Sequence, residues 1–247
     1  MKPHPLMPKL KELRLGGMAE TLEDRARQAQ EKSLSPTEFL ALLLDDEIDR
    51  RERGRMARSL REGRIDETKT LARFDFSAAP SAPKSLLGEL ALCRWIERGE
   101  NLLLAGPTGT GKTHLAMALA FEAVRRGHKV FCQSAGALAG KLYSSRADGT
   151  YNRLYSKLVT CDLLVLDDFG LVPLTPQGAE DLYNLICERY ERRSILLTSN
   201  RAPEEWAGVF GNPLMASAAL DRLTHHSHLL ILEGESYRQR ERKKKAK

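Results

Sequence analysis

The sequence predicts an α/β fold, in which helices cover both faces of a parallel sheet, preceded by a small all-helical N-terminal domain. Three observations predict it. From residue 84 onward, short apolar segments with strand character alternate with helical segments. One of those strands runs directly into a glycine-rich loop, and residues 1 to about 70 show helical patterns only. Short apolar strands separated by helices are typical of a parallel sheet buried on both faces.

The glycine-rich loop carries the strongest functional signal. Residues 101–113 join an apolar strand to the pattern G-x-x-x-x-G-K-T, and an amphipathic helix follows from 114 to 126. The glycines let the backbone N–H groups face inward around a β-phosphate, Lys112 supplies charge for the β- and γ-phosphates, and Thr113 a hydroxyl for Mg²⁺. We therefore expect ATP and Mg²⁺ as cofactors. The residues predicted to hold the nucleotide are Gly106, Pro107, Thr108, Gly109, Thr110, Gly111, Lys112, Thr113 and His114.

Composition bounds the class of protein. A chain of 247 residues that is 42% hydrophobic suits one sizeable α/β core with a helical appendage. No stretch is long and apolar enough to span a bilayer, and Met1-Lys-Pro-His-Pro lacks the apolar core of a secretion signal, so we expect a cytoplasmic protein without a membrane partner. The four cysteines contain no C-x-x-C pair, which argues against a zinc ribbon or a disulfide framework.

Positive charge gathers in two places. The formal net charge is +6, and residues 50–64 hold seven arginines against two acids. Residues 236–247 hold seven bases against one acid. Such runs are most often solvated faces or tails, but two of them flanking a nucleotide-binding domain favour nucleic acid as a partner.

The N-terminal helices have readable boundaries. A loose apolar stripe from Leu10 to Leu22 is interrupted at Gly16-Gly17. Ser35-Pro36-Thr37-Glu38 combines a capping serine, a proline at the first helical position and a glutamate three residues on, so a helix starts there and ends near Gly63. We assign residues 1–72 to an adaptor or oligomerisation domain, 73–83 to a linker whose two phenylalanines dock on the next domain, 84–240 to the ATPase domain, and 241–247 to a basic tail.

Two further strands end in polar residues that fit the same site. The strand over 163–167 ends in Asp167, predicted to hold the Mg²⁺ shell, followed by Asp168, predicted to polarise the attacking water. The strand over 195–199 delivers Asn200 toward the γ-phosphate to orient that water. The alternatives are that Asp168 caps the next loop and that Asn200 is a turn former. Helices are expected over 84–98 and 176–192, and a helical region over 135–158 with a loop tip at Gly149. Other strands are expected over 101–105, 129–133 and 229–232.

The order of five motifs resembles one family. G-P-T-G-T-G-K-T, L-L-V-L-D-D-F-G, L-L-T-S-N, A-L-D-R-L-T-H-H-S-H and G-E-S-Y-R appear as in the IstB-type helper ATPases, which are AAA+ proteins close to the DnaC helicase loaders. The resemblance covers nearly the whole chain. It implies an AAA+ fold and a catalytic set comprising Lys112, Asp168, Asn200, Arg222 and Arg238.

The resemblance also assigns the two arginines and the partners. Arg222 matches the arginine finger that one subunit inserts into its neighbour's site, and Arg238 matches the sensor arginine that contacts nucleotide within its own chain. The implied function is an oligomeric, ATP-dependent helper of insertion-sequence transposition that assembles on and deforms duplex DNA for a transposase of the IstA type. Rival interpretations are a replicative helicase loader, a nonenzymatic ATP-gated binding module and, more weakly, a small-molecule kinase.

One departure from the wider AAA+ pattern concerns rate. Many AAA+ ATPases carry glutamate after the metal-binding aspartate, whereas Asp168 is shorter by one methylene. We therefore predict slow hydrolysis that partners stimulate.

Two remaining clusters invite hypotheses. For DNA, bases and aromatics between the second and third strands predict a track for the sugar-phosphate backbone, read without base sequence, although an ordinary solvated helix pair is the alternative. These residues are Lys141, Tyr143, Arg146, Tyr151, Arg153 and Lys157. The run His225-His226-x-His228 has no accompanying cysteine or acidic ligand nearby in the sequence, so it does not predict a metal site.

Overall fold

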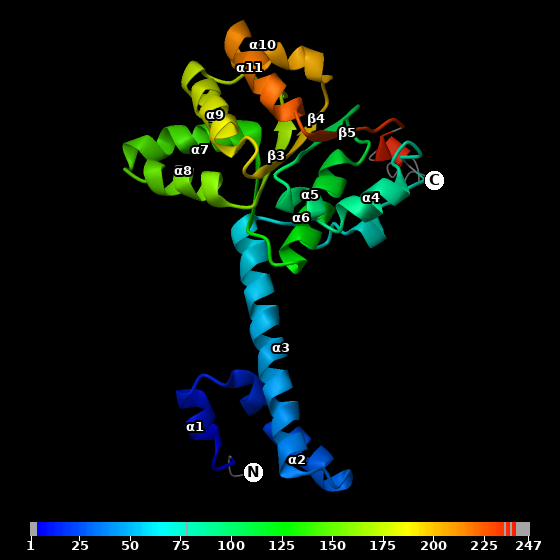
Figure 1. The fold of residues 1–247 in the computed structure, drawn as a ribbon, viewed down its shortest axis with the longest axis vertical. Helices are drawn as coiled ribbons and strands as arrows, with labels where there is room; N and C mark the ends of the chain where they lie inside the picture. Colours follow the sequence, from blue (N-terminus) through cyan, green and yellow to red (C-terminus); the bar gives the residue numbers. More distant parts are fainter. Residues whose placement is uncertain (1–3, 78, 235, 238, 241–247) are drawn as a thin grey trace. The chain divides into compact units, whose positions relative to one another are not determined.

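The structure is a computed structural model that describes residues 4–77, 79–234, 236–237 and 239–240. Its contacts divide the chain into two compact units, Met1–Arg58 and Ser59–Lys247 (Figure 1). The division falls inside a helix, and residues 59–72 pack with the larger unit, whereas the sequence pattern places the change of domain near residue 72. Among the described residues, no helix has the length and apolar character needed to cross a membrane.

The N-terminal unit is helical, as predicted. It contains α1 (Met7–Glu12), α2 (Gly16–Glu31) and the first part of α3 (Pro36–Gly63). The expected capping motif opens α3: the Ser35 N–H and hydroxyl both donate to the Glu38 carboxylate at 2.7 Å, and the Glu38 N–H donates back to Ser35 Oγ at 3.3 Å. A small core of Leu10, Met18, Leu22 and Leu43 holds the helices together.

Two acidic residues of α3 hold α2 in place. The Gly17 N–H donates to Glu47 Oε2 at 2.6 Å, and a side chain at Gly17 would meet the backbone of Asp46 and Glu47, at 2.6 Å from the Asp46 carbonyl oxygen. Arg25 donates two hydrogen bonds to Asp46, at 2.6 and 2.8 Å. This guanidinium lowers the pKa of Asp46 from 3.8 to about 2.

The larger unit contains a five-stranded sheet with its covering helices. Its strands are β1 (Asn101–Ala105), β2 (Val130–Ser134), β3 (Leu163–Phe169), β4 (Ser194–Ser199) and β5 (Ser227–Ile231). Its helices are η1 (Leu71–Arg73), α4 (Lys84–Leu90), α5 (Arg94–Glu97), α6 (Lys112–Arg125), α7 (Ala135–Ala147), α8 (Tyr151–Thr160), α9 (Pro176–Arg189), η2 (Pro203–Trp206), α10 (Ala207–Phe210) and α11 (Pro213–Thr224).

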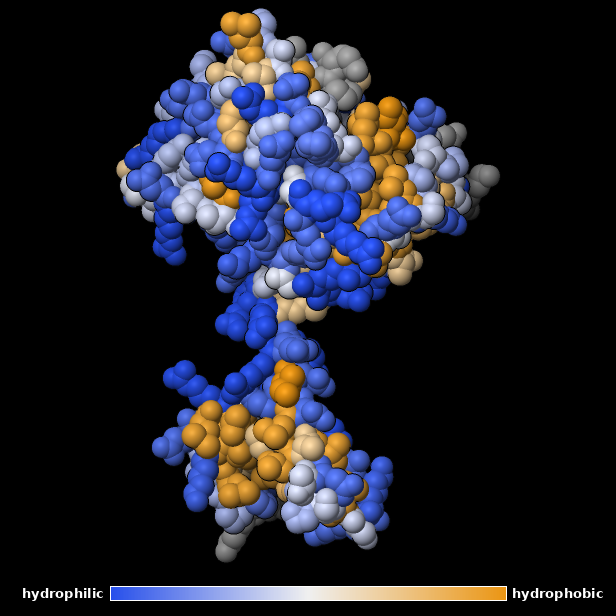
Figure 2. Space-filling model, viewed as in Figure 1, coloured by the Kyte–Doolittle hydropathy of each residue, from blue (hydrophilic) through white to orange (hydrophobic). Residues whose placement is uncertain are grey.

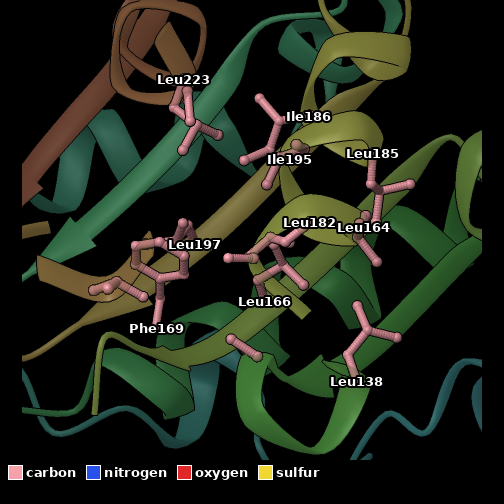
Figure 3. Close-up of a cluster of buried hydrophobic side chains, with 14 of the residues drawn as sticks. Leu138, Leu164, Leu166, Phe169, Leu182, Leu185, Ile186, Ile195, Leu197 and Leu223 are labelled. Atoms are coloured by element: carbon pink, nitrogen blue, oxygen red, sulfur yellow. The ribbon is translucent and has the colours of Figure 1, made fainter. Parts of the chain in front are cut away.

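The sheet is parallel throughout, in the order β2-β3-β4-β1-β5. Alternate residues of its strands face opposite sides. Leu103, Leu164, Leu166, Ile195 and Leu197 belong to one core with the apolar sides of α7, α8, α9 and α11. Figure 3 shows the β3 and β4 members of this core among side chains of α7, α9 and α11. The intervening leucines are also buried, and α6 packs against four of the strands. Helices therefore cover both faces, as the apolar strands predicted.

The structure corrects some predicted boundaries. The helix expected over 84–98 is broken between α4 and α5, where Cys93 adopts a left-handed backbone with φ of 61°. The helical region expected over 135–158 consists of two helices, and Gly149, whose φ is 72°, lies in the turn between them as expected. The third strand extends two residues beyond Asp167, to Phe169.

Replacing Asp46 with Asn is expected to destabilise the N-terminal unit by about 1–2 kcal/mol at neutral pH, because the amide cannot pair with the Arg25 guanidinium. The pKa of Asp46 is lowered by folding, so its stabilisation is complete above 3.8 and is lost as the pH falls toward 2. Calorimetric unfolding at neutral and acidic pH measures this difference. Asp49→Asn is the matched control, since Asp49 is exposed on the same helix; equal losses in both variants would contradict the role of the Arg25 pair.

Candidate nucleotide-binding site

The loop between β1 and α6 has the backbone shape that its glycines predict. Gly106, Gly109 and Gly111 have φ values of 140°, 90° and 93°, in the region that side chains disfavour. A Cβ at Gly106 would lie 2.1 Å from the carbonyl oxygen of Leu232, just past β5. A Cβ at Gly111 would lie 2.7 Å from the Phe74 ring. Glycine is therefore required here by close packing as well as by backbone conformation.

Lys112 begins α6 with its ammonium group held against the loop. The side chain is buried, and Nζ donates to the carbonyl oxygens of Gly106 and Pro107, each at 2.7 Å. The Thr110 hydroxyl donates to the same Pro107 oxygen at 2.9 Å. The positive charge of Lys112 therefore lies beside the loop, at the amino end of α6. A charge and backbone N–H groups placed together in this way bind phosphate.

Side-chain oxygen atoms from α6, β3 and β4 lie close together beside the loop. Asp167 Oδ1 accepts from the Thr113 hydroxyl at 3.0 Å and from the Thr198 hydroxyl at 2.5 Å. Hydroxyl and carboxylate oxygens are the ligands that Mg²⁺ prefers, with water completing the shell. Thr113 and Asp167 therefore fit the metal that the sequence predicts for this position.

A β-bulge shapes this cluster. Leu166 pairs with Leu197 and Phe169 with Ser199, so that two residues of β3, Asp167 and Asp168, stand opposite the single residue Thr198 of β4. Asp168 has a left-handed backbone with φ of 53°, and its N–H donates to Thr198 Oγ1 at 3.0 Å. In a regular strand adjacent side chains point to opposite faces. Here both aspartates line one pocket.

That pocket has a volume of about 490 Å³ and brings most of the predicted site together. It is lined by predicted residues Thr108, Gly109, Thr110, Gly111, Lys112, Thr113, His114, Asp167, Asp168 and Asn200. It is also lined by residues that sequence reasoning did not assign to the site: Lys69, Arg73, Phe74, Asp75, Ala79, Leu171 and Tyr237. Gly106 and Pro107 do not line it, and contribute the carbonyls that hold Lys112.

Most of the additional lining residues come from segments near the two ends of the larger unit, residues 69–79 and Tyr237. Phe74 packs edge-on against Phe76 and against His114, with ring centroids 4.9 and 5.4 Å apart, so the docking of this segment is confirmed. The His114 ring nitrogen lies 2.9 Å from the Thr70 carbonyl oxygen. From the other end, the Tyr237 N–H donates to the Gly109 carbonyl at 3.0 Å. Flat, partly apolar walls beside a phosphate loop suit a nucleotide base.

The two predicted arginines have different positions. Arg238 lies outside the described residues. Arg222 is on the last turn of α11, where its Nη1 donates to the Ala218 carbonyl at 2.8 Å. The Arg222 carbonyl accepts from the side chain of Asn101, the first residue of β1, at 3.4 Å. The phosphate loop follows the opposite end of β1, roughly 13 Å away, because the five residues of the strand are separated by four steps of about 3.3 Å. Arg222 is not among the residues that line its own chain's pocket.

Residues 8–245 match the protein family described as IstB-like ATP binding protein. The chain belongs to the IstB-like family of ATP-binding proteins. It is 40% identical over 234 residues to a Mycobacterium tuberculosis protein named as ATP-binding in an insertion sequence, covering 94% of this chain and 93% of that one. It is 37% identical over 241 residues to the Pseudomonas aeruginosa protein of the same kind from insertion sequence IS21, covering 98% and 91%.

Solved structures support the AAA+ form of the P-loop fold. DnaA from Aquifex aeolicus bound to AMPPCP is 26% identical with a TM-score of 0.58, over 73% of this chain and 55% of that one. The DnaC helicase loader gives a TM-score of 0.52 at 22% identity, over 60% of this chain and 86% of that one. The IstB-like protein is thus an ATP-binding protein of the type found in IS21-like insertion sequences, with an AAA+ fold.

Gly106→Ala is expected to weaken ATP binding about tenfold or more, because backbone strain and the clash with Leu232 cost on the order of 1–3 kcal/mol. Titration with a fluorescent ATP analogue measures the affinity. Gly136→Ala is the control, since a Cβ at Gly136 in α7 meets nothing within 4 Å. Unchanged affinity in Gly106→Ala would show that the close approach of Leu232 does not shape the loop.

Proposed function

We propose that this IstB-like protein is a slow, Mg²⁺-dependent ATPase that assembles as an oligomer on duplex DNA and recruits or stimulates a transposase of the IstA type. The observation that carries the proposal is the separation between Arg222 and its own nucleotide pocket. An arginine at the amino ends of the strands cannot serve a phosphate bound at their carboxyl ends within one chain. It can serve the site of a neighbouring subunit, which makes ATP binding and assembly interdependent.

The pocket offers a division of labour for hydrolysis. Lys112 binds the β- and γ-phosphates, and Thr113 and Asp167 would hold Mg²⁺, which neutralises charge on the phosphate oxygens. Asp168, displaced onto the same pocket by the bulge, accepts a proton from the attacking water, and Asn200 orients that water. Arg238 is assigned by resemblance to contact the γ-phosphate. The short reach of Asp168 supports slow turnover that DNA or a partner accelerates.

Thr198→Val should lower ATP hydrolysis roughly ten- to hundredfold while ATP binding changes little, as for other residues that orient a metal ligand. The valine keeps the shape of the side chain but cannot donate to Asp167 or accept from the Asp168 N–H. Steady-state phosphate release and nucleotide titration measure the two effects separately. Thr160→Val, on the exposed side of α8, is the control. Hydrolysis at the wild-type rate by Thr198→Val would contradict a role for the hydrogen bonds that Thr198 makes with Asp167 and Asp168.

The surroundings of Arg222 suit an arginine presented to another subunit. Its guanidinium carbon lies 6.0 Å from the ring centres of both Tyr183 and Tyr190, which restrict the side chain without neutralising it. Its hydrogen bond to a helix carbonyl is one that a phosphate or carboxylate of a neighbour can replace.

A cluster of positive charge at the edge strand β2 supports DNA binding. Lys141 and Lys157 lie with their ammonium groups 6.0 and 5.3 Å from the Phe131 ring centre, and Arg64 donates to Gln133 at 3.0 Å. Burial, together with the charges of Arg64 and Lys157, lowers the pKa of Lys141. Like charges held together in this way are relieved by phosphate groups.

Arg146 and Tyr151, which the sequence also suggests for DNA binding, both bind the Asp181 carboxylate instead. Arg146 makes a two-point ion pair with the buried carboxylate of Asp181, at 2.5 and 2.7 Å, and Tyr151 donates to the same carboxylate at 3.0 Å. Their interactions hold α7 and α8 against α9. The proposed phosphate contacts therefore rest on Lys141 and Lys157, with the exposed Tyr143 of α7 and the exposed Arg153 of α8 as further candidates.

The N-terminal unit is the proposed contact for other subunits or for the transposase. Leu40, Leu44 and Ile48 recur every four residues on α3 and remain 46–53% exposed. Figure 2 shows a continuous hydrophobic area on this unit. Apolar surface gathered in this way is typical of a protein-binding face.

Light scattering after size exclusion tests the proposal as a whole. ATP is expected to assemble several subunits on a duplex long enough to hold them. Arg222→Ala should abolish assembly but leave the unassembled chain's affinity for nucleotide unchanged, because its own pocket lacks Arg222. Lys141→Gln with Lys157→Gln should weaken duplex binding for all sequences alike and reduce its dependence on salt.

The other outcomes point to the rival functions. Assembly on single-stranded DNA with no response to duplex would replace the transposition helper with a helicase loader. ATP-driven assembly with no hydrolysis above background would indicate a nonenzymatic, ATP-gated binding module. A monomer under all conditions would overturn the shared site.

A further inference from the structure

We propose that Glu191, His225 and His226 form a site for Zn²⁺ or a similar divalent transition-metal ion, at the amino ends of the sheet strands and separate from the nucleotide pocket. Glu191 lies in the turn between α9 and β4, and the two histidines lie between α11 and β5. The sequence shows the histidine run but not its acidic partner, because Glu191 stands 34 positions before His225.

The spacing of the three side chains is close to that of a metal site. Glu191 Oε1 lies 3.7 Å from His225 Nδ1 and 3.7 Å from His226 Nε2. One possible ligand atom from each residue falls within 4.8 Å of the others. Tetrahedral ligands at the usual zinc distance of about 2.0–2.1 Å are about 3.3 Å apart. Side-chain shifts of a few tenths of an ångström to about 1.5 Å therefore suffice.

The chemistry of the donors selects the kind of ion. Two imidazoles and one carboxylate are typical of zinc sites that keep a further position open, whereas Mg²⁺ prefers oxygen ligands alone. The Tyr190 hydroxyl lies 2.6 Å from His225 Nδ1 and borders the same cavity of about 280 Å³. On metal binding, the Tyr190 hydroxyl would either give up its hydrogen bond with His225 Nδ1, so that this nitrogen binds the ion, or bind the ion itself.

The backbone holds two of the ligands in unusual conformations. Glu191 and His226 both have left-handed φ values, of 56° and 50°. The His226 carbonyl accepts from the Asn101 N–H at 3.1 Å, which anchors the histidine turn to the start of β1. Gly99 packs so closely that a Cβ there would lie 3.2 Å from the carbonyl carbon of Glu191. The two turns are thus fixed to the same part of the sheet.

The third histidine of the motif is engaged elsewhere. His228 Nε2 lies 2.8 Å from Glu100 Oε2, and Glu100 also accepts two hydrogen bonds from Arg98, at 2.6 and 2.9 Å. The proposed ligands are therefore Glu191 with two histidines rather than the three histidines of the motif. The carboxylate also brings negative charge that offsets the ion.

A metal here would fix the helix that carries Arg222. His225 directly follows α11, three residues after Arg222. The Tyr190 hydroxyl lies 2.6 Å from His225 Nδ1, and the Tyr190 ring centre lies 6.0 Å from the guanidinium carbon of Arg222. An ion joining Glu191 to His225 would tie the end of α11 to the turn after α9. This link to assembly rests on the proposed role of Arg222, whereas binding of the ion does not.

Calorimetric titration of untagged, full-length protein with Zn²⁺ tests the site, and the visible absorption of bound Co²⁺ reports the ligand geometry. We expect one ion per chain, with affinity reduced at least about tenfold in Glu191→Gln and in His226→Asn, in line with the loss of a ligand or its supporting group. Asparagine tolerates the left-handed backbone at position 226. Circular dichroism verifies that each variant is folded.

Two control variants locate the ion. His128→Asn removes a histidine outside the cluster, and Cys187→Ser removes the cysteine that is not fully buried. Both should bind Zn²⁺ like the wild type. Absence of saturable binding, equal affinity in the cluster variants, or loss of binding in Cys187→Ser would each overturn the site. These results are independent of ATP and DNA, so they leave the proposed function to its own test.

Discussion

The hydroxyl of Thr198 is the contact on which the arrangement of the nucleotide site depends. It donates to Asp167 and accepts from the Asp168 N–H, and so fastens β3 to β4 where their pairing is interrupted. Without the bulge, the alternation of side chains along a strand would send one of the two adjacent carboxylates to the far face of the sheet. The left-handed backbone at Asp168 carries a conformational cost, and the hydrogen bonds across the bulge offset it.

The same constraint reaches the phosphate loop. Asp167 also accepts from Thr113, so one carboxylate connects the end of β3, the end of β4 and the first turn of α6. The loop is further enclosed by segments from both ends of the larger unit, Phe74 against Gly111 and Leu232 against Gly106. A nucleotide in this pocket would therefore contact parts of the chain more than 150 residues apart, such as Phe74 and Tyr237. Binding can stabilise the whole larger unit for that reason.

The sequence predicts the fold well where local signals are strong. The apolar strand before G-P-T-G-T-G-K-T is found as β1 at the predicted residues, and the capping motif at Ser35 opens α3 as expected. It predicts less where tertiary contacts decide. Cys93 breaks a helix without a glycine or proline, and the bulge at Asp167 depends on pairing with β4, which no local pattern reveals. Thr198 escaped notice because a threonine near the end of a buried strand is ordinary until its partner is known.

The carboxyl and amino ends of the parallel strands carry different groups of candidate functional residues. Loops at the carboxyl ends of the strands hold Lys112, Asp167 and Asn200 in one pocket, the usual position for a ligand in a parallel α/β sheet. The amino ends present Arg222 and, beside it, the histidine turn. If Arg222 serves a neighbour's pocket, as proposed, the chain carries both halves of a shared site at opposite ends of its strands. In the proposed assembly, each interface would join one subunit's pocket to its neighbour's arginine and leave one of each at the two ends, so the assembly could extend by repeating a single contact.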